Sequence, residues 1–165
     1  MFRDLKSDEI DVRVAQIKQN GLSLLLYKSA RVDQDILDET VGQYNWQRRH
    51  SRDNANCEVG LYDKDKKEWI WKEDTGTESN TEKEKGLASD SFKRACFNWG
   101  IGRELYTAPF IWIPAEKCNI EQDKMGKFKT KDTFYVNAIE IQDKKIIGLE
   151  IKNNKNERVF IWKKS

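Results

Sequence analysis

A change of hydrophobic period in the middle of the chain most strongly constrains its fold. Before residue 45, apolar residues recur at helical spacing, whereas 45–76 contains three strand-like runs. The stretches DNAN and KDKK separate these runs and are rich in turn-forming residues. Short runs joined by such turns are typical of an antiparallel β-β-β meander.

A long helix is predicted to follow the meander, over 82–100. Leu87, Ser91, Ala95 and Trp99 fall on one face at helical spacing, and the sequence GIG then ends the helix. The polar stretch 75–86 leads into it, either as a loop or as the frayed start of the helix.

Two further helices are predicted near the N-terminus. In 8–19, Ile10, Val14 and Ile17 lie at helical spacing, and 29–44 repeats such a pattern between a capping serine and a glycine. The apolar run 22–28 between them fits a continued helix, a buried strand or a turn into the next element.

The last third of the chain is predicted to be rich in strands. A short apolar strand is expected at 110–113, a charged loop at 121–133, and three strands within 134–163. The fold class is therefore α+β, in which the meander packs against a long helix (a β-β-β-α core) with N-terminal helices and a β-rich C-terminal segment. A single domain is expected over 1–165.

Composition limits the functional classes. The 30 basic and 28 acidic residues leave a net charge of +2, so a polyanionic partner requires cations gathered on one surface. The three widely spaced cysteines, Cys57, Cys96 and Cys118, suggest reduced thiols. No apolar run approaches the roughly 20 residues of a membrane span, and the charged first residues have no signal-peptide core. We expect a cytoplasmic protein that does not bind a membrane.

Enzymatic motifs are not found. No glycine-rich phosphate loop is present, and the single histidine, His50, has no nucleophile elbow near it in sequence. We predict that the protein is not an enzyme and needs no cofactor or metal. A metal-dependent nuclease is the remaining enzymatic alternative, for which the candidate carboxylates are Asp33, Asp35, Asp38 and Asp74.

The stretch WQRRHSR, residues 46–52, is the first candidate nucleic-acid contact. In a strand Arg48, His50 and Arg52 share one face with Trp46. Cations for phosphates beside an aromatic ring for bases are what single-strand binding requires. A solvated sheet face covered by a tryptophan is the alternative.

Cations on the predicted helices form the other candidates. Lys93 and Arg94 are adjacent, so they lie about 100° apart at the rim of a helix face. Arg31 is placed at the start of its helix, where positive charge opposes the helix dipole. A plain surface role is the alternative for each.

Two stretches in this order, RVDQDILDETVGQYNW before the meander and ASDSFKRACFNWGIGRELY after it, resemble the DNA-binding domain of the Rad fifty-two family of single-strand annealing proteins. This family includes short phage and prophage annealers. The resemblance covers about 24–106, whereas 107–165 matches no motif of the family and is expected to be a β-rich extension.

The resemblance implies ATP-independent binding of single-stranded DNA and annealing of complementary strands in homologous recombination and repair. It implies a homo-oligomeric ring, DNA contacts through the backbone without sequence preference, and the host cytoplasm if a phage encodes the protein. It implies that Lys93 and Arg94 contact phosphates, that Arg31 contacts DNA and that Tyr44 lies near it. Together with WQRRHSR, the predicted DNA-binding residues are Lys93, Arg94, Arg31, Tyr44, Arg48, Arg49, Arg52 and Trp46.

Two other functions remain open. A protein that coats single strands without annealing them needs the same contacts, and a protein-interaction module would use the charges only for solubility.

Overall fold

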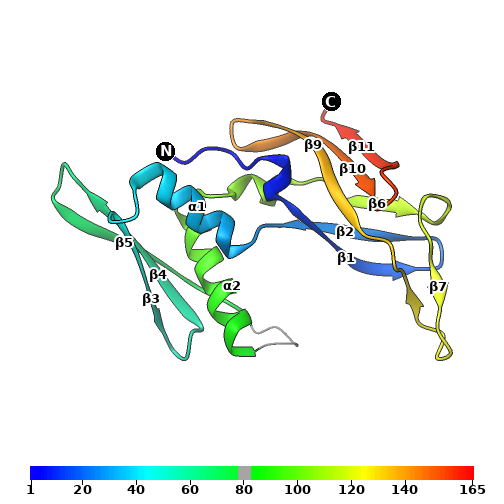
Figure 1. Cartoon of the computed structure of the whole chain (residues 1–165), viewed down its shortest axis with the longest axis horizontal. Helices are drawn as coiled ribbons and strands as arrows, with labels where there is room; N and C mark the ends of the chain where they lie inside the picture. Colours follow the sequence, from blue (N-terminus) through cyan, green and yellow to red (C-terminus); the bar gives the residue numbers. More distant parts are fainter. Residues whose placement is uncertain (78–82) are drawn as a thin grey trace. The chain divides into compact units, whose positions relative to one another are not determined.

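The chain divides into two compact units, each with its own internal contacts. The computed structural model describes residues 1–77 and 83–165. Unit 1 comprises Met1–Asp4 and Lys28–Arg103, and unit 2 comprises Leu5–Tyr27 and Glu104–Ser165. The elements define an α+β protein with antiparallel sheets, as predicted (Figure 1). The single domain over 1–165 stays a prediction.

Unit 1 contains one three-stranded sheet of order β3-β4-β5. All its strand pairs are antiparallel and follow chain order, in agreement with the meander predicted for 45–76. Helix α2 packs against β4 and β5 and also contacts α1. The described residues do not include residue 82, where the predicted helix begins, or the middle of the polar stretch 75–86. The elements are α1 (Ala30–Val41), β3 (Trp46–Ser51), β4 (Asn56–Asp63), β5 (Glu68–Thr75) and α2 (Lys83–Asn98).

Helix α1 has the ends that its sequence predicts. The Ser29 hydroxyl accepts a hydrogen bond from the Val32 amide, and Gly42 adopts a left-handed φ of 86° at the other end. Glycine is favoured there because a Cβ would be strained in that conformation. Ile36 and Leu37 on this helix are fully buried.

The core of unit 1 lies where α2 meets the sheet. Val59 and Cys57 of β4 and Phe92, Ala95 and Cys96 of α2 are fully buried. All three cysteines of the chain are free, as their spacing predicts.

Unit 2 is built almost wholly from strands. One sheet has the order β1-β2-β6 and a second has the order β11-β10-β9, whose buried side chains include Val136, Leu149, Ile151 and Val159. The predicted charged loop 121–133 is wrong in part, because it contains two short strands paired as a hairpin. The strands are β1 (Asp11–Lys18), β2 (Gly21–Tyr27), β6 (Ile111–Pro114), β7 (Glu121–Gln122), β8 (Phe128–Lys129), β9 (Phe134–Gln142), β10 (Lys145–Asn153) and β11 (Arg158–Lys163), and short 3-10 helices span Ser7–Glu9, Arg103–Thr107 and Ala115–Lys117.

The predicted helix over 8–19 is wrong, so the N-terminal helices reduce to α1 alone. Most of 8–19 is strand β1, and a bulge between Val14 and Gln16 shifts its register by one residue. The bulge keeps Val14 and Ile17 on one face although they are three residues apart, because they pair with Leu24 and Leu22. This spacing imitates a helical period. The run 22–28 is mainly strand β2.

Candidate nucleic-acid interface

Strand β3 directs alternate side chains toward α2. The Trp46 ring stacks on the Phe92 ring with 6.0 Å between centroids, and its indole N–H donates to Asp38 of α1 at 2.7 Å. The Arg48 guanidinium lies 4.6 Å from the Phe92 ring centroid. Trp46, Arg48 and His50 therefore share one face, as predicted, but this face packs toward the helix instead of forming an open stripe. Arg48 nevertheless remains exposed.

His50 lies near the end of β3, on the same face as Trp46 and Arg48. Its Nδ1 lies 3.4 Å from the Ser91 hydroxyl, and its Nε2 is buried without a hydrogen-bond partner among the described residues. Burial lowers the pKa of His50, and the positive charge of Arg48 lowers it further. The imidazole is thus held in its neutral form at neutral pH.

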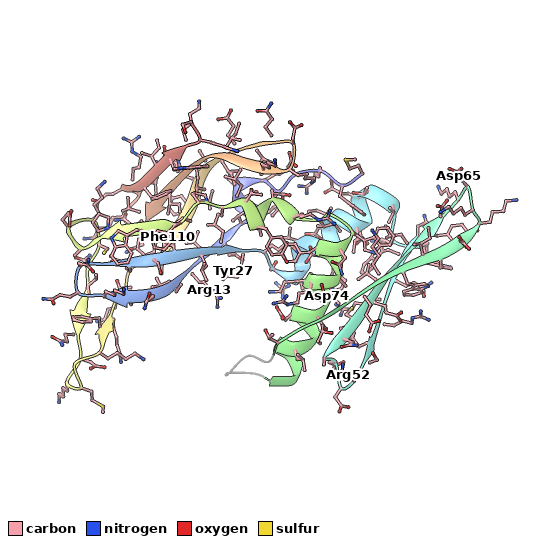
Figure 2. All side chains as sticks on the ribbon, turned by 180° about the vertical axis from the view of Figure 1, so that it is seen from behind. Arg13, Tyr27, Arg52, Asp65, Asp74 and Phe110 are labelled. Atoms are coloured by element: carbon pink, nitrogen blue, oxygen red, sulfur yellow. The ribbon has the colours of Figure 1, made fainter. Side chains whose placement is uncertain are left out.

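Arg52 does not share the face of Trp46, Arg48 and His50, so this part of the sequence prediction is wrong. It lies in the turn after β3, where Arg52, Asp53 and Asn54 adopt φ values of 52°, 51° and 71° (Figure 2). Three successive left-handed residues reverse the chain before the strand alternation reaches position 52. Arg52 is exposed at the tip of the hairpin.

Arg49 points to the opposite face of the sheet. Its guanidinium lies 3.6 Å from the Trp71 ring centroid and 3.2 Å from the Glu58 carboxylate. These contacts hold Arg49 on the outer face of the sheet, which is the face directed away from Phe92.

Beneath Lys93 lies a buried ion pair that sequence reasoning missed. The Lys28 ammonium donates to both oxygens of Asp33, at 2.5 and 2.6 Å, and to the Lys93 carbonyl at 3.3 Å. The Lys28 and Asp33 side chains are 1% and 0% exposed. Lys28 also lies 4.0 Å from the Phe97 ring centroid, so it joins the start of α1 to α2. A lysine that ends an apolar run, directly before a helix cap, was the available signal.

The charge of Lys93 acts on this pair. Burial raises the pKa of Asp33 to about 6 and lowers the pKa of Lys28. Lys93 contributes to lowering both pKa values, because a second cation nearby disfavours Lys28 protonation and favours the Asp33 carboxylate. Lys28, Lys93 and Asp33 thus place two cations beside one carboxylate.

Lys93 and Arg94 differ in their surroundings. The Arg94 side chain is 41% exposed, and its guanidinium pairs with Asp90 one turn earlier, at 3.2 Å. Asp90 also accepts a hydrogen bond from the Thr77 amide. Within the described part of the chain, the Lys93 ammonium makes no hydrogen bond or ion pair. Of the two cations, Lys93 is therefore the one that pairs with no counterion among the described residues.

Arg31 lies at the start of α1, and Tyr44 follows the end of that helix. Arg31 is exposed in the first helical turn, and Tyr44 is 92% exposed in the connection from α1 to β3. Neither forms a hydrogen bond or ion pair with another predicted DNA-binding residue among those described. The structure groups Trp46 with Arg48 around Phe92 of α2, and Lys93 and Arg94 directly follow Phe92 on the same helix.

An aromatic cluster on the outer face of the sheet is the second feature that sequence reasoning missed. Tyr62 meets Trp69 edge-on with 5.6 Å between centroids, and Trp69 lies 6.1 Å from Trp71. Gly60 lies under Trp71, since a Cβ at Gly60 would come within 2.7 Å of that ring. The alternation of tryptophans in EWIWKED was the available signal.

No family model, curated protein or solved structure matches this chain. Over the described residues, none of the helices combines the length and apolar character that a membrane crossing requires. Likewise, no three His, Cys, Asp or Glu side chains in that part of the chain are grouped so that they could hold a metal ion.

Proposed function

We propose that this protein binds single-stranded DNA without sequence preference and anneals complementary strands without nucleotide hydrolysis. The observation that carries the proposal is the arrangement around Lys93. Both oxygens of the Asp33 carboxylate accept hydrogen bonds from buried Lys28, and the Lys93 ammonium beside them makes no ion pair with the described residues. A phosphate at this position would supply the missing counterion and relieve the repulsion between the two ammonium groups.

Arg48 and Tyr44 extend the proposed contact surface. Arg48 is positioned by the Phe92 ring while remaining exposed, which suits a contact to the DNA backbone. Tyr44 offers an exposed ring on which a base can stack. In this proposal Trp46 positions Arg48 through Phe92, and Arg31 and Arg94 add charge along α1 and α2.

The resemblance to the Rad fifty-two family agrees with the extent of unit 1. The resembling stretch, about 24–106, nearly coincides with the long segment Lys28–Arg103 of that unit. We take β3, β4, β5 and α2 as the β-β-β-α core of an annealing protein that assembles into a ring and acts in recombination and repair. Strands β3 and β5 form the two edges of their sheet, which leaves backbone groups for pairing between subunits. A phage origin and a cytoplasmic location belong to the same proposal.

The test is salt-dependent fluorescence anisotropy with labelled oligo-dT, comparing wild type with Lys93→Ala and Arg94→Ala. We expect Lys93→Ala to weaken binding by about 1.5–3 kcal/mol, the usual contribution of a charge-assisted contact. The slope of log affinity against log salt should also become shallower by about 0.7 for one lost phosphate contact. Arg94→Ala should have a smaller effect, because its charge is already shared with Asp90.

Lys66→Ala/Lys67→Ala is the matched control, since it removes exposed cations from the turn between β4 and β5. Circular dichroism must show that every variant is folded. If Lys93→Ala is folded and binds as well as the control with an unchanged salt slope, Lys93 does not contact DNA and the proposal fails.

A further inference from the structure

The sheet β1-β2-β6 of unit 2 has one buried face and one exposed face. Residues paired across antiparallel strands lie on the same side, so the register assigns each face. Leu22 pairs with Ile113 and Leu24 with Ile111, and all four are buried. The opposite face carries Ser23 paired with Trp112, Leu25 with Arg13 and Tyr27 with Asp11.

Large apolar side chains are exposed on that second face. Leu25 is 46% exposed, Tyr27 is 39% exposed, and Phe110, just before β6, is 77% exposed. Figure 2 labels Phe110 and Tyr27 together with Arg13. Isolated exposed apolar residues are ordinary, but several on one sheet face indicate a surface that binds something.

The Trp112 ring on this face lies over the sheet, with the Phe110 ring nearly parallel to it. Trp112 extends over Gly21, where a Cβ would come within 2.6 Å of the indole. Phe110 is stacked near it, with 6.4 Å between ring centroids and 18° between ring planes. Nearly parallel rings along the β6 edge of the sheet form a platform of the kind on which unpaired bases stack.

Two cations lie on the same face, on β1 at the edge of the sheet opposite β6. Arg13 lies opposite Leu25 and Lys18 opposite Gly21, whereas Asp11 is the one acidic residue of β1 on this face. Both cations are exposed.

The hairpin of β7 and β8, which contacts β1, carries four lysines and three acidic residues over 121–132, and its Lys129 pairs with Asp123 at 3.4 Å. Its Lys127 lines a hollow of about 580 Å³ together with Gln16 and Ile17 of β1. The hairpin and its flanks also carry the exposed residues Lys124 and Lys131.

We propose that this face of unit 2, defined by Tyr27, Phe110, Trp112, Arg13 and Lys18, is a second binding site for single-stranded nucleic acid. Bases stack on the three rings while Arg13 and Lys18 contact phosphates. The outer face of β3-β4-β5 also carries aromatic rings, but there Arg49 already covers Trp71 and pairs with Glu58. This site goes beyond the proposed function, because it uses none of the residues around Lys93 and lies outside the stretch 28–103.

The first experiment is photo-crosslinking of the full chain to an oligonucleotide containing 5-iododeoxyuridine, followed by mass spectrometry of the crosslinked peptides. This halogenated base crosslinks to aromatic side chains with which it stacks. We expect crosslinks at Tyr27, Phe110 or Trp112. Crosslinks confined to unit 1 would overturn the proposal.

The second experiment measures oligo-dT binding by Tyr27→Ala/Phe110→Ala. Both side chains are exposed, so the variant should remain folded. Loss of one or two stacked bases should weaken binding at least about fivefold, and up to about 150-fold for a single strong stack. The salt slope should not change, because no phosphate contact is lost. Ile161→Ala, which removes a 60% exposed apolar residue from β11, is the matched control and should bind as wild type.

The outcomes separate this site from the one around Lys93. If Tyr27→Ala/Phe110→Ala weakens binding and Lys93→Ala does not, the second site stands and the function proposed for unit 1 fails; the reverse result overturns only the second site. If the aromatic variant binds oligo-dT normally but loses self-association in sedimentation velocity, the face contacts another copy of this chain and the proposal is wrong.

Discussion

At the scale of single residues, His50 is a reporter of the proposed interface because it is the only histidine in the chain. Its pKa is lowered first by burial and then by the charge of Arg48. A phosphate bound to Arg48 would offset that charge. We therefore expect the pKa of His50, followed by NMR, to rise when oligo-dT is added.

Arg48→Gln supplies the control for this measurement. It should raise the pKa of His50 without DNA, since it removes the same charge, and DNA should then have little further effect. A pKa of His50 that stays constant on DNA addition to wild type, while binding is saturated, would show that no phosphate approaches Arg48.

The same pKa has a consequence for stability. A folded-state pKa below the unfolded value of 6.5 means that the unfolded chain binds the proton more readily. The contribution of His50 to stability is thus present above pH 6.5 and lost as the pH falls through the folded-state value. The His50 titration should therefore be recorded with the fold verified at each pH.

The buried Lys28–Asp33 pair affects the electrostatics of the proposed site although neither residue is proposed to contact a ligand. A buried ammonium is tolerated only with a close counterion and hydrogen bonds, and Asp33 and the Lys93 carbonyl supply both. The pair joins the start of α1 to α2 and engages the Asp33 carboxylate, which lies near Lys93. In the proposed site the Lys93 charge is then available to a phosphate.

At the scale of elements, Gly60 of β4 determines how the outer face of its sheet packs. A Cβ at Gly60 would come within 2.7 Å of the Trp71 ring, which lies across the strand. We expect Gly60→Ala to lower the free energy of unfolding by about 1–3 kcal/mol, the usual cost of overpacking. Urea unfolding measures the change.

A double-mutant cycle with Trp71→Leu tests the cause. If the clash with the ring is responsible, Gly60→Ala should cost much less when Trp71 is already replaced, so the two effects are not additive. Equal costs in both backgrounds would assign the effect to the β4 backbone and would contradict the packing argument.

The elements also show why part of the fold could be predicted from sequence. Helix α1 has local signals at both ends, Ser29 and Gly42, and β3, β4 and β5 are separated by turn-forming residues. Strand β1 was mistaken for a helix because its bulge places Val14 and Ile17 three residues apart. A bulge depends on the partner strand, so the spacing within β1 alone does not reveal it.

The candidate site was predictable only in part, for the same reason. The strand period correctly placed Trp46, Arg48 and His50 on one face, but the contact of that face with Phe92 depends on tertiary packing. The pairing of Lys28 with Asp33 joins two residues whose burial is set by α2, far along the chain. Local pattern identifies which residues share a face and does not identify what covers that face.

At the scale of the whole molecule, the small net charge of +2 has to be reconciled with the proposed binding to single-stranded DNA. Overall attraction is weak, so affinity must come from local cations such as Lys93 and Arg48. An assembly multiplies such a local patch, because each subunit contributes the same contacts to one strand. Binding to short oligonucleotides should therefore be weak, and binding should strengthen with strand length.

Annealing is the activity that separates the proposed function from simple coating of single strands. An annealing protein holds the DNA backbone and leaves the pairing edges of the bases accessible, so complementary strands should pair faster with the protein than without it. Base pairing supplies the free energy, and the rate should not depend on ATP. A fluorescence-quenching assay with two labelled complementary strands measures this rate. Lys93→Ala should lose the acceleration, while Lys66→Ala/Lys67→Ala should retain it. Slower pairing in the presence of wild type, at concentrations that saturate the strands, would identify a coating protein instead.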